Sequence, residues 1–451
     1  MTQRTLVVIG GDAAGMGAAA QARRNDPELE IIAFERGEHT SYIACGMPYM
    51  IAGLVASPDD LVVVPPHVFR ERYDIQVHTR HEVVEIAPVE QRVRVERLDD
   101  GHTFWQSYDE LLIATGAVPI VPDLEGVDAE GIFCLKSLAS GVAVATYIES
   151  TQPRRAVIVG GGHIGLEMAE ALRLRGIETT LIDLARQVMV TLDEEMATLV
   201  ADALAAMDVQ LYLNEGLVGF ETQGGRVQAV VTDQRTLPAD LVILGIGIRP
   251  NSDLARDAGI ALGVRDAIRV NPQMQTETPH VWAAGDCTES IHRVSGEPVF
   301  VALGTVANKT GRIAGLNLTG VPTAFPGVLG TAITKVGETE IARTGLNTQE
   351  CEELGQEYVV TQITATTPAG FYPGASEIHV RLLAEPGTGR LLGGQIVGGP
   401  GSGKRIDTIA ASLTAGLTAQ DLVDMDLSYA PPFSPVWDPV QTAARVLLRQ
   451  I

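Results

Sequence analysis

The sequence predicts an α/β fold followed by a mixed α+β part, and three observations support this. An apolar run, Leu6 to Ile9, ends in glycines and leads through a small-residue segment to the stretch EIIAFE. The same order returns from residue 155, in RAVIVGGGHIGLEMAEALRLRG followed by TTLID. From about Phe325 the pattern changes to alternating stretches separated by glycines. Strand, glycine turn, helix and strand form a βαβ unit, so we expect two Rossmann-like dinucleotide-binding domains.

The first unit continues beyond its second strand. The helix is predicted over GMGAAAQARR, and Asn25, Asp26 and Pro27 close it. Alternating residues in QRVRVERL, before an Asp-Gly turn, predict a small antiparallel excursion. The apolar stretch in YDELLIATGAVP then predicts a strand that ends in a glycine.

The second unit repeats this order. Its strand is predicted over Ala156 to Val159, and Gly176 stops its helix. GRVQAVVT and LPADLVILGIGIRPN repeat the excursion and the strand that ends in glycine. Two related nucleotide-binding domains explain the repetition better than a chance similarity. The apolar face of the helix holds Ile164, Met168, Ala171, Leu172 and Leu174.

The remaining segments complete the domain prediction. PHVWAAGDC predicts another buried strand, and the stretches after Phe325 predict antiparallel strands followed by helices near 404–417 and 419–425. We expect residues 1–150 and 271–324 to form the first nucleotide-binding domain. Residues 151–270 are expected to form the second, and residues 325–451 the α+β domain.

Length, charge and cysteine content exclude several classes of protein. The 451 residues suit about three domains. The 33 Lys and Arg against 56 Asp and Glu give a net charge of −23, so we expect neither nucleic acid nor a membrane as partner. Four cysteines fit a reducing compartment. With no long apolar run and a strand in place of a signal peptide, we expect a cytoplasmic protein without a metal site.

Both glycine loops carry the pattern that binds a dinucleotide pyrophosphate. In the second loop Gly160, Gly162 and Gly165 match GxGxxG, and Asp183 stands at a strand end, where an acid binds a ribose hydroxyl. In the first loop Gly10 and Gly15 fit, Asp12 takes the place of the middle glycine, and Glu35 is the acid. A single loop of this kind is a weak signal, but two in strand–turn–helix context predict two bound dinucleotides.

The acid of the second loop bears on the choice of nucleotide. Asp183 would repel a 2′-phosphate and therefore favours NADH over NADPH. Arg186 lies three residues on and would soften this preference.

Cys45 lies in TSYIACGMPYMIAGLV, directly after the first unit. Pro48 suits the first turn of a helix, so we expect Cys45 at a helix N-terminus, where the partial positive charge lowers a thiol pKa. The alternative is a buried small hydrophobe, the usual place of a free cysteine. Because no second cysteine is near, a redox Cys45 would act alone, through a sulfenate or a mixed disulfide. The other cysteines, Cys134, Cys287 and Cys351, are expected to be structural.

Several segments together carry a resemblance to a known family. They are VVIGGDAAGM, IIAFERGE, SYIACGMPY, LLIATGAVP, VIVGGGHIGLE, LGIGIRPN, VWAAGDC, NKTGRIAG, FYPGA and SYAPPFS. The chain resembles the flavin-dependent pyridine nucleotide–disulfide oxidoreductases over essentially its whole length. Within them it is most similar to the single-cysteine branch, and especially to coenzyme A–disulfide reductases.

The resemblance implies FAD and NADH or NADPH as cofactors, and a homodimer formed through the third domain, which becomes a dimerisation domain. Thr115 and Gly116 would close over FAD, and Asp286 would bind the ribityl chain. The positions that the resemblance assigns to cofactor binding are Gly10, Gly11, Ala14, Gly15, Glu35, Arg36, Ala114, Thr115, Gly116, Gly160, Gly162, His163, Ile164, Gly165, Glu167, Asp183, Gly247, Gly285 and Asp286.

Two further features place the chain within the branch. Single-cysteine NADH oxidases and peroxidases carry a His in the first loop, where this chain has Ala13. Coenzyme A–disulfide reductases use two tyrosines of the partner subunit instead, and Tyr372 and Tyr429 match them. The alternative is that both tyrosines belong to a core.

The substrate positions agree only in part with this branch. Gln21, Arg24 and Ser41 match residues that contact coenzyme A. Ala44, Tyr73 and Trp437 depart from the Asn and the two basic residues found there, and His163 replaces the usual Tyr. We therefore expect reduction of coenzyme A disulfide or a related disulfide or persulfide. An oxidase or peroxidase with a cysteine sulfenate, and an electron carrier with an idle cysteine, remain as alternatives.

Overall fold

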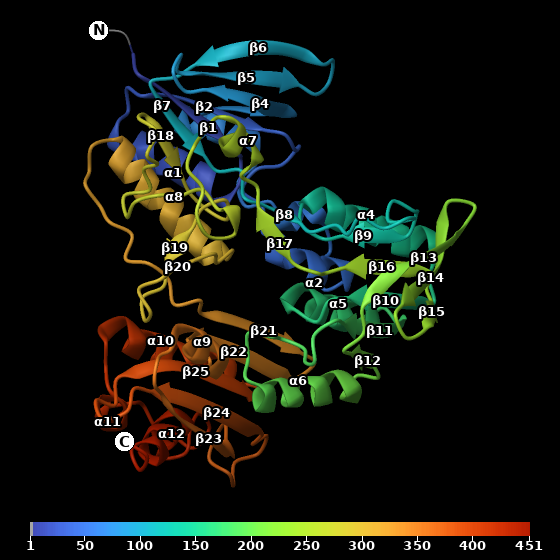
Figure 1. The fold of residues 1–451 in the computed structure, drawn as a ribbon, viewed down its shortest axis with the longest axis vertical. Coiled ribbons are helices and arrows are strands. Elements are labelled where there is room, and N and C mark those ends of the chain that lie inside the picture. Colours follow the sequence, from blue (N-terminus) through green and yellow to red (C-terminus); the bar gives the residue numbers. More distant parts are fainter. Residues whose placement is uncertain (1–2) are drawn as a thin grey trace.

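The computed structural model describes residues 3–451, and it divides into three bodies (Figure 1). The first nucleotide-binding region lies at the top of the view, the second at the right and the C-terminal domain at the bottom. Two parallel sheets and one antiparallel sheet form the centres of these bodies. The predicted fold class is confirmed, since this is the architecture that the repeated βαβ pattern predicts.

The first sheet has the strand order β18-β7-β1-β2-β3, and all its strands run parallel. Its strands are near-continuous apolar runs because both faces are covered, one by helices and the other mainly by the antiparallel segment that contains Val83, Val93 and Val95. Helices α1 (Ala13–Asn25) and α8 (Gly304–Leu318) pack closely through small side chains such as Ala14, Ala18 and Gly311. The strands are β1 (Thr5–Ile9), β2 (Glu30–Glu35), β3 (Gln76–Thr79), β7 (Glu110–Ile113) and β18 (Val281–Ala283).

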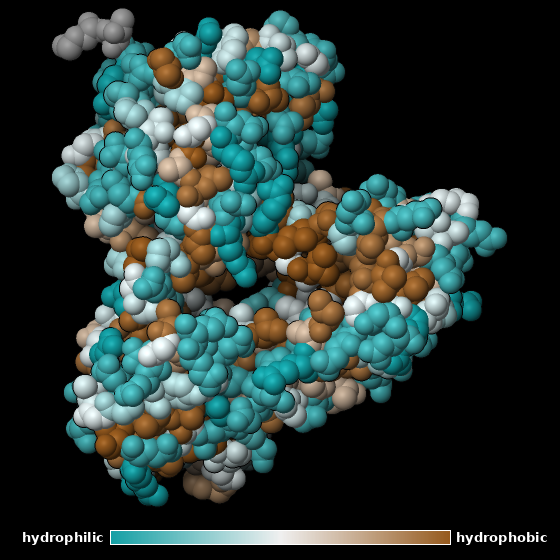
Figure 2. All heavy atoms as spheres, in the orientation of Figure 1, coloured by the Kyte–Doolittle hydropathy of each residue, from teal (hydrophilic) through white to brown (hydrophobic). Residues whose placement is uncertain are grey.

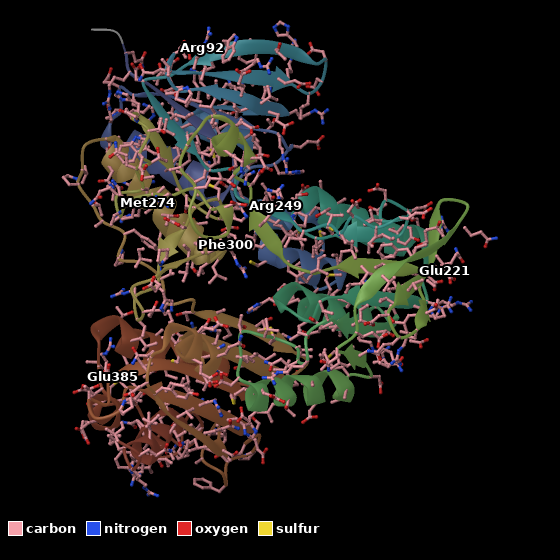
Figure 3. All side chains as sticks on the ribbon, in the orientation of Figure 1. Arg92, Glu221, Arg249, Met274, Phe300 and Glu385 are labelled. Carbon is pink, nitrogen blue, oxygen red and sulfur yellow. The ribbon has the colours of Figure 1, made fainter. Side chains whose placement is uncertain are left out.

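An antiparallel sheet, β4-β5-β6, covers the upper end of this body. The guanidinium of Arg92, labelled in Figure 3, lies 4.2 Å from the ring centroid of Trp105 on this sheet. Strands β8 and β17 pair with each other at the junction toward the right-hand body, where Figure 3 labels Arg249. The elements are α3 (Pro66–Tyr73), β4 (His81–Ala87), β5 (Arg92–Arg97), β6 (His102–Ser107), β8 (Ala117–Pro119), β17 (Ile248–Pro250), α7 (Asp253–Asp257), β19 (Ser290–Ile291) and β20 (Pro298–Val299).

The second sheet has the order β12-β11-β10-β16-β9, again parallel. It includes β9 (Ile132–Cys134), a strand that precedes residue 151, where we expected this domain to begin. The elements are α4 (Leu138–Thr151), β10 (Arg155–Val159), α5 (His163–Leu174), β11 (Glu178–Asp183), α6 (Glu194–Ala206), β12 (Gln210–Leu213), β13 (Leu217–Gln223), β14 (Arg226–Thr232), β15 (Thr236–Pro238) and β16 (Leu241–Leu244).

A short helix of the first region packs against the second one. Helix α2 (Met47–Ile51) contacts α4 and α5, and Met47, Met50 and Ile51 share one core cluster with side chains of α5. The segment just before α2 therefore lies where the first and second bodies meet. Figure 2 shows apolar surface on the wall of the hollow between these two bodies.

The C-terminal domain is an antiparallel sheet of order β21-β22-β25-β24-β23 with helices against it. The helices predicted near 404–417 and 419–425 are α10 and α11. Within residues 3–451 no helix is long and apolar enough to span a membrane. The elements are β21 (Ala332–Val336), β22 (Thr339–Gly345), α9 (Thr348–Leu354), β23 (Val359–Thr366), β24 (Glu377–Ala384), β25 (Leu391–Gly398), α10 (Ile406–Ala415), α11 (Ala419–Asp424) and α12 (Pro439–Leu447).

Candidate active site

The first glycine loop joins β1 to α1. Gly10 has φ +110°, and a Cβ there would run into the carbonyl of Ala114. A Cβ on Gly15 would likewise run into the carbonyl of Gly10, so both positions require glycine. The carboxylate of Glu35 accepts hydrogen bonds from Gly11 N–H and Gly37 N–H, both at 2.7 Å. This leaves the start of α1 open to an anion and fixes the acid at the end of β2.

The second loop has the same construction. Gly160 has φ +107°, and a Cβ on Gly165 would run into the Gly160 carbonyl. Asp183 accepts from Gly161 N–H at 2.6 Å and from Ala185 N–H at 2.7 Å. A Cβ on Gly162 would meet nothing within 4 Å, so the space beside this loop is open.

Asp12 distinguishes the first loop from the second. It precedes α1 as the N-cap residue but makes no capping hydrogen bond, and its Oδ1 is buried without a partner within residues 3–451. Burial, partly offset by backbone hydrogen bonds, and the nearby charge of Glu35 raise the pKa of Asp12 to about 6. The side chain is therefore protonated far more readily than an ordinary aspartate.

The segments after β7 and β18 close around the first loop. Thr115 Oγ1 donates to Asn251 O at 2.5 Å, which ties the end of β7 to the residue after β17. A Cβ on Gly285 would press on Ala14, so Gly285 and Asp286 lie beside α1. Lys136 Nζ contacts Asp286 Oδ2 at 3.2 Å, and Asp286 Oδ1 is buried without a partner in the described chain.

These observations test whether the first loop fits FAD. A pyrophosphate needs glycine backbone and a free helix N-terminus, and the loop offers both. A ribityl chain carries hydroxyl donors, and the unpartnered Oδ1 atoms of Asp12 and Asp286 are acceptors. A carboxylate beside a phosphate would be repulsive, but the raised pKa of Asp12 allows its neutral form. The residues present therefore fit the cofactor.

Other predicted cofactor positions border these loops. Arg36 is exposed, and its guanidinium lies 3.9 Å from Glu82. Gly247, with φ +115°, follows β16, and its carbonyl accepts from Ile120 N–H at 3.0 Å. His163 begins α5, and burial lowers its pKa, which favours a neutral imidazole. Ile164 packs against the core cluster of this domain.

Cys45 lies in the 3₁₀ turn Ala44–Gly46, just before α2, and its side chain is exposed. The interpretation as a buried hydrophobe is therefore wrong. The predicted low pKa is not found either: the side chain reaches solvent, but neighbouring groups shield its sulfur in part, and this desolvation, followed by the charge of Glu167, raises the pKa of Cys45. Lys136 opposes this shift. Helix α2 has only five residues, so its dipole offers little compensation.

Glu167 joins the second and third domains near Cys45. Its carboxylate accepts from Thr334 Oγ1 at 3.0 Å, and burial raises its pKa. One helical turn on, Glu170 pairs with Lys335 at 2.6 Å. The sequence interpretation missed Lys136, which lies beside Asp286, and Thr334, which lies beside Glu167. Neither residue stands in a motif that indicates this contact.

Tyr372 and Tyr429 are both exposed, at 38% and 49%, so the alternative of two core tyrosines is wrong. Ala369 N–H donates to Pro431 O at 2.9 Å and so joins the two tyrosine segments. These segments lie in the lowest body of Figure 1, apart from α2, so one chain does not bring the tyrosines to Cys45.

The predicted substrate residues form two groups. Arg24 Nη2 donates to Gln21 Oε1 at 2.9 Å on α1. Ser41, in the left-handed region with φ 47°, donates its N–H to Gly11 O at 3.0 Å. Trp437 replaces an expected lysine, but the guanidinium carbon of Arg445 lies 4.3 Å from the centroid of the Trp437 ring. Arg445 therefore places a positive charge near Trp437, although position 437 itself carries no basic residue.

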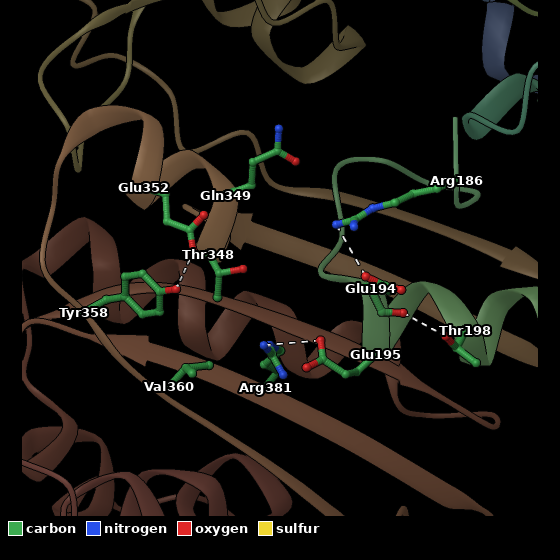
Figure 4. A pocket seen from close by; sticks show the side chains of 10 residues that line it. All are labelled: Arg186, Glu194, Glu195, Thr198, Thr348, Gln349, Glu352, Tyr358, Val360 and Arg381. Carbon is green, nitrogen blue, oxygen red and sulfur yellow. Dashed lines mark hydrogen bonds and ion pairs between the residues drawn. The ribbon is translucent and has the colours of Figure 1, made fainter. Parts of the chain in front are cut away.

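A polar cavity of about 790 Å³ lies between the second and third domains (Figure 4). It does not include Cys45. Arg186 reaches into it and contacts Glu194 at 3.4 Å. Within residues 3–451 no cluster of three metal-ligating side chains is present. The cavity is lined by Arg186, Glu194, Glu195, Thr198, Thr348, Gln349, Glu352, Tyr358, Val360 and Arg381.

Comparisons with known proteins agree with this geometry. Residues 4–318 match the pyridine nucleotide-disulphide oxidoreductase family, and residues 331–439 match its dimerisation domain. The chain belongs to this family and is an oxidoreductase; the predicted family is confirmed.

Three relatives are informative. The NAD(P)H coenzyme A polysulfide/persulfide reductase of Pyrococcus horikoshii is 41% identical over 446 residues, 99% of this chain and 98% of the relative. The reduced CoADR-RHD of Bacillus anthracis has a TM-score of 0.96 and 37% identity, and the match covers 100% of this chain and 81% of that one. A Methanocaldococcus jannaschii protein named NADH oxidase is 34% identical over 450 residues, 99% of each chain.

Proposed function

We propose that the protein uses NADH or NADPH, with FAD, to reduce a small-molecule disulfide or persulfide at Cys45. The observation that carries this is a single exposed sulfur where the first and second bodies meet, beside Lys136 and Glu167. Cys287 and Cys351 are buried elsewhere, and Cys134 is half-buried in β9. A cycle with one protein thiol and one substrate thiol follows from this arrangement.

The two loops divide the nucleotides between them. The first loop, with Glu35, Thr115 and Asp286, holds FAD, and the second, with Asp183, holds the nicotinamide nucleotide. FAD, when bound, supplies the transfer of an electron pair from the nicotinamide to the Cys45 disulfide. Residues 1–150 and 271–324 form the FAD domain, except that β9 extends the second domain, and residues 325–451 form the dimerisation domain.

Cys45 is the nucleophile toward the substrate. Its thiolate attacks R–S–S–R, forms Cys45–S–S–R and expels one thiolate RS⁻. Two electrons then cleave the mixed disulfide and release RS⁻ and the Cys45 thiolate. The raised pKa of the free thiol lowers the fraction of Cys45 that is thiolate, and the attack proceeds from that fraction. Lys136 stabilises this thiolate by its positive charge.

The proton comes from the partner subunit. Tyr429 donates it to the departing thiolate, and Tyr372 positions or shares that proton. Both phenols are exposed in one chain and lie away from its own Cys45, as residues that serve the second subunit of a homodimer should.

The substrate is a thiol disulfide or persulfide of the coenzyme A class. Gln21, Arg24 and Ser41 support a coenzyme A-like ligand, and Arg445 offers a cation beside Trp437. Ala44 and Tyr73 lack the polar and basic groups of the coenzyme A–disulfide reductases, so the thiol carrier differs in part.

Replacement of Cys45 tests the proposal. Cys45→Ser should keep NADH-driven flavin reduction and lose disulfide turnover, whereas Cys134→Ser, the matched control, should keep both. Full turnover by Cys45→Ser would refute the proposal. The relative named NADH oxidase suggests a second candidate, which stoichiometric NADH-driven oxygen consumption without added disulfide would support. Ala13, in place of the loop histidine, argues against it.

A further inference from the structure

The two tyrosines lie in irregular segments that no strand pairing holds in place. Tyr372 lies in the turns between β23 and β24, and Tyr429 between α11 and α12. Both side chains are exposed, so core packing does not fix them either. Their relative position therefore depends on contacts made by neighbouring residues.

One guanidinium connects both segments. Arg405, at the start of α10, has a side chain that is only 13% exposed. Its Nη2 donates to Thr367 O, before Tyr372, and to Phe433 O, after Tyr429, both at 2.7 Å. Its Nη1 donates to Gly401 O.

The fourth contact of this guanidinium is an ion pair. Arg405 Nε donates to Asp438 Oδ2 at 2.9 Å, and Asp438 Oδ1 accepts from Val440 N–H at 2.9 Å as the N-cap of α12. Ser434 Oγ also donates to Asp438, at 3.2 Å. The end of the Tyr429 segment is thus fixed to the same group that holds the Tyr372 segment.

We propose that Arg405 is a positioning residue that sets Tyr372 and Tyr429 relative to each other for the partner's active site. This inference rests on the proposed function of the tyrosines. A planar fork with donors in several directions can serve two carbonyls and a carboxylate at once, whereas a lysine cannot. Loss of the fork leaves two exposed loops joined by a single backbone hydrogen bond.

The test separates the two halves of the cycle by rapid mixing. Arg405→Ala and Arg405→Lys should reduce flavin with NADH at the wild-type rate. Reoxidation by coenzyme A disulfide or polysulfide, whichever the wild type reduces faster, should slow by on the order of 10²-fold in Arg405→Ala and about tenfold in Arg405→Lys. Added guanidinium ion should restore part of the Ala variant's rate, which a merely structural role would not predict.

Lys404→Gln is the matched control. Lys404 is the neighbouring residue, its side chain is 77% exposed, and it pairs with Asp407 on the surface. It should reoxidise like the wild type. Wild-type reoxidation in both Arg405 variants would overturn the inference.

Two further comparisons keep the outcomes distinct. Wild-type reoxidation rates in Cys45→Ser would refute the proposed function itself, whereas dependence on Cys45 without dependence on Arg405 would refute only this inference. If the Arg405 variants do not fold as dimers, Asp438→Asn decides, because it keeps a helix cap and removes the ion pair. It should slow reoxidation severalfold, and an unchanged rate would overturn the inference.

Discussion

The two glycine loops are built on one backbone plan, but only the first carries an ionisable acid at its middle position. In both, a glycine with positive φ packs under a neighbouring carbonyl, and an acid at the end of the next strand accepts from the second loop residue. The middle position is Asp12 in the first loop and Gly162, with open space around it, in the second. The shared backbone supports the proposal that both loops bind nucleotides. The first loop therefore contains a buried titratable group that the second loop lacks.

The largest effect is expected when Gly10 or Gly160 gains a Cβ, which would run into the carbonyl of Ala114 or of Gly245. Gly10→Ala should yield protein without FAD, and Gly160→Ala should keep FAD and lose NADH-driven reduction by on the order of 10²-fold, because strain of about 1–3 kcal/mol adds to a clash. Flavin absorbance and rapid-mixing rates measure these effects. Gly176→Ala is the control, since Gly176 also has positive φ but a Cβ there meets nothing within 4 Å. Loss of FAD in both variants would contradict the assignment of FAD to the first loop and of the nicotinamide nucleotide to the second.

The buried carboxyl makes FAD binding depend on pH. The pKa of Asp12 is about 6 in the chain alone, and the phosphate of FAD bound at this loop would raise it further, so FAD binding should take up a proton between these two pKa values. The dissociation constant should therefore be flat below pH 6 and rise by up to about tenfold per pH unit above it. Fluorescence titration of the apoprotein measures this. Asp12→Asn, which is neutral at every pH, should remove the slope; an unchanged slope contradicts the assignment.

Nucleotide binding at the second loop should also become dependent on pH when its middle position carries a carboxyl group. Gly162 has φ −82°, which any residue adopts, so Gly162→Asp introduces charge without strain. NADH binding should weaken by about tenfold at pH 8 and recover at lower pH, because a carboxylate repels the pyrophosphate. Gly162→Asn should bind NADH normally. Equal affinities of the two variants would show that charge at this position does not matter.

The acid of the second loop is expected to have the smallest effect, on nucleotide choice. Asp183→Asn should shift the ratio of kcat/KM toward NADPH by about fivefold, because the repulsion of a 2′-phosphate is lost. Glu194→Gln, which frees Arg186, should shift it in the same direction by less, since so exposed an ion pair contributes little. If Asp183→Asn leaves the ratio of kcat/KM for NADPH and NADH unchanged, Asp183 does not determine the choice of nucleotide.

Local patterns predicted most of the fold. The strands at β1 and β10, the helices after them and the two acids are all set by residues close in the chain, so periodicity and glycine spacing were sufficient. Strand β9 was placed differently from our expectation, because its pairing with β16 joins segments about a hundred residues apart. Such pairing leaves no local signal.

The site was less predictable for the same reason. Cys45 was identified from its own segment, but its raised pKa depends on burial and on Glu167, which another domain contributes. Lys136 and Arg405 have no motif around them, and their importance follows only from the groups they contact. Chemistry carried by one segment can be predicted from sequence, whereas electrostatics assembled from several segments cannot.

The most direct test of the single-thiol cycle is the mass of the intact, non-reduced protein after anaerobic treatment with coenzyme A disulfide. We expect one coenzyme A added per subunit, on the peptide that contains Cys45, with one free thiol released. An unmodified Cys45, or an adduct on Cys134 instead, would contradict the account.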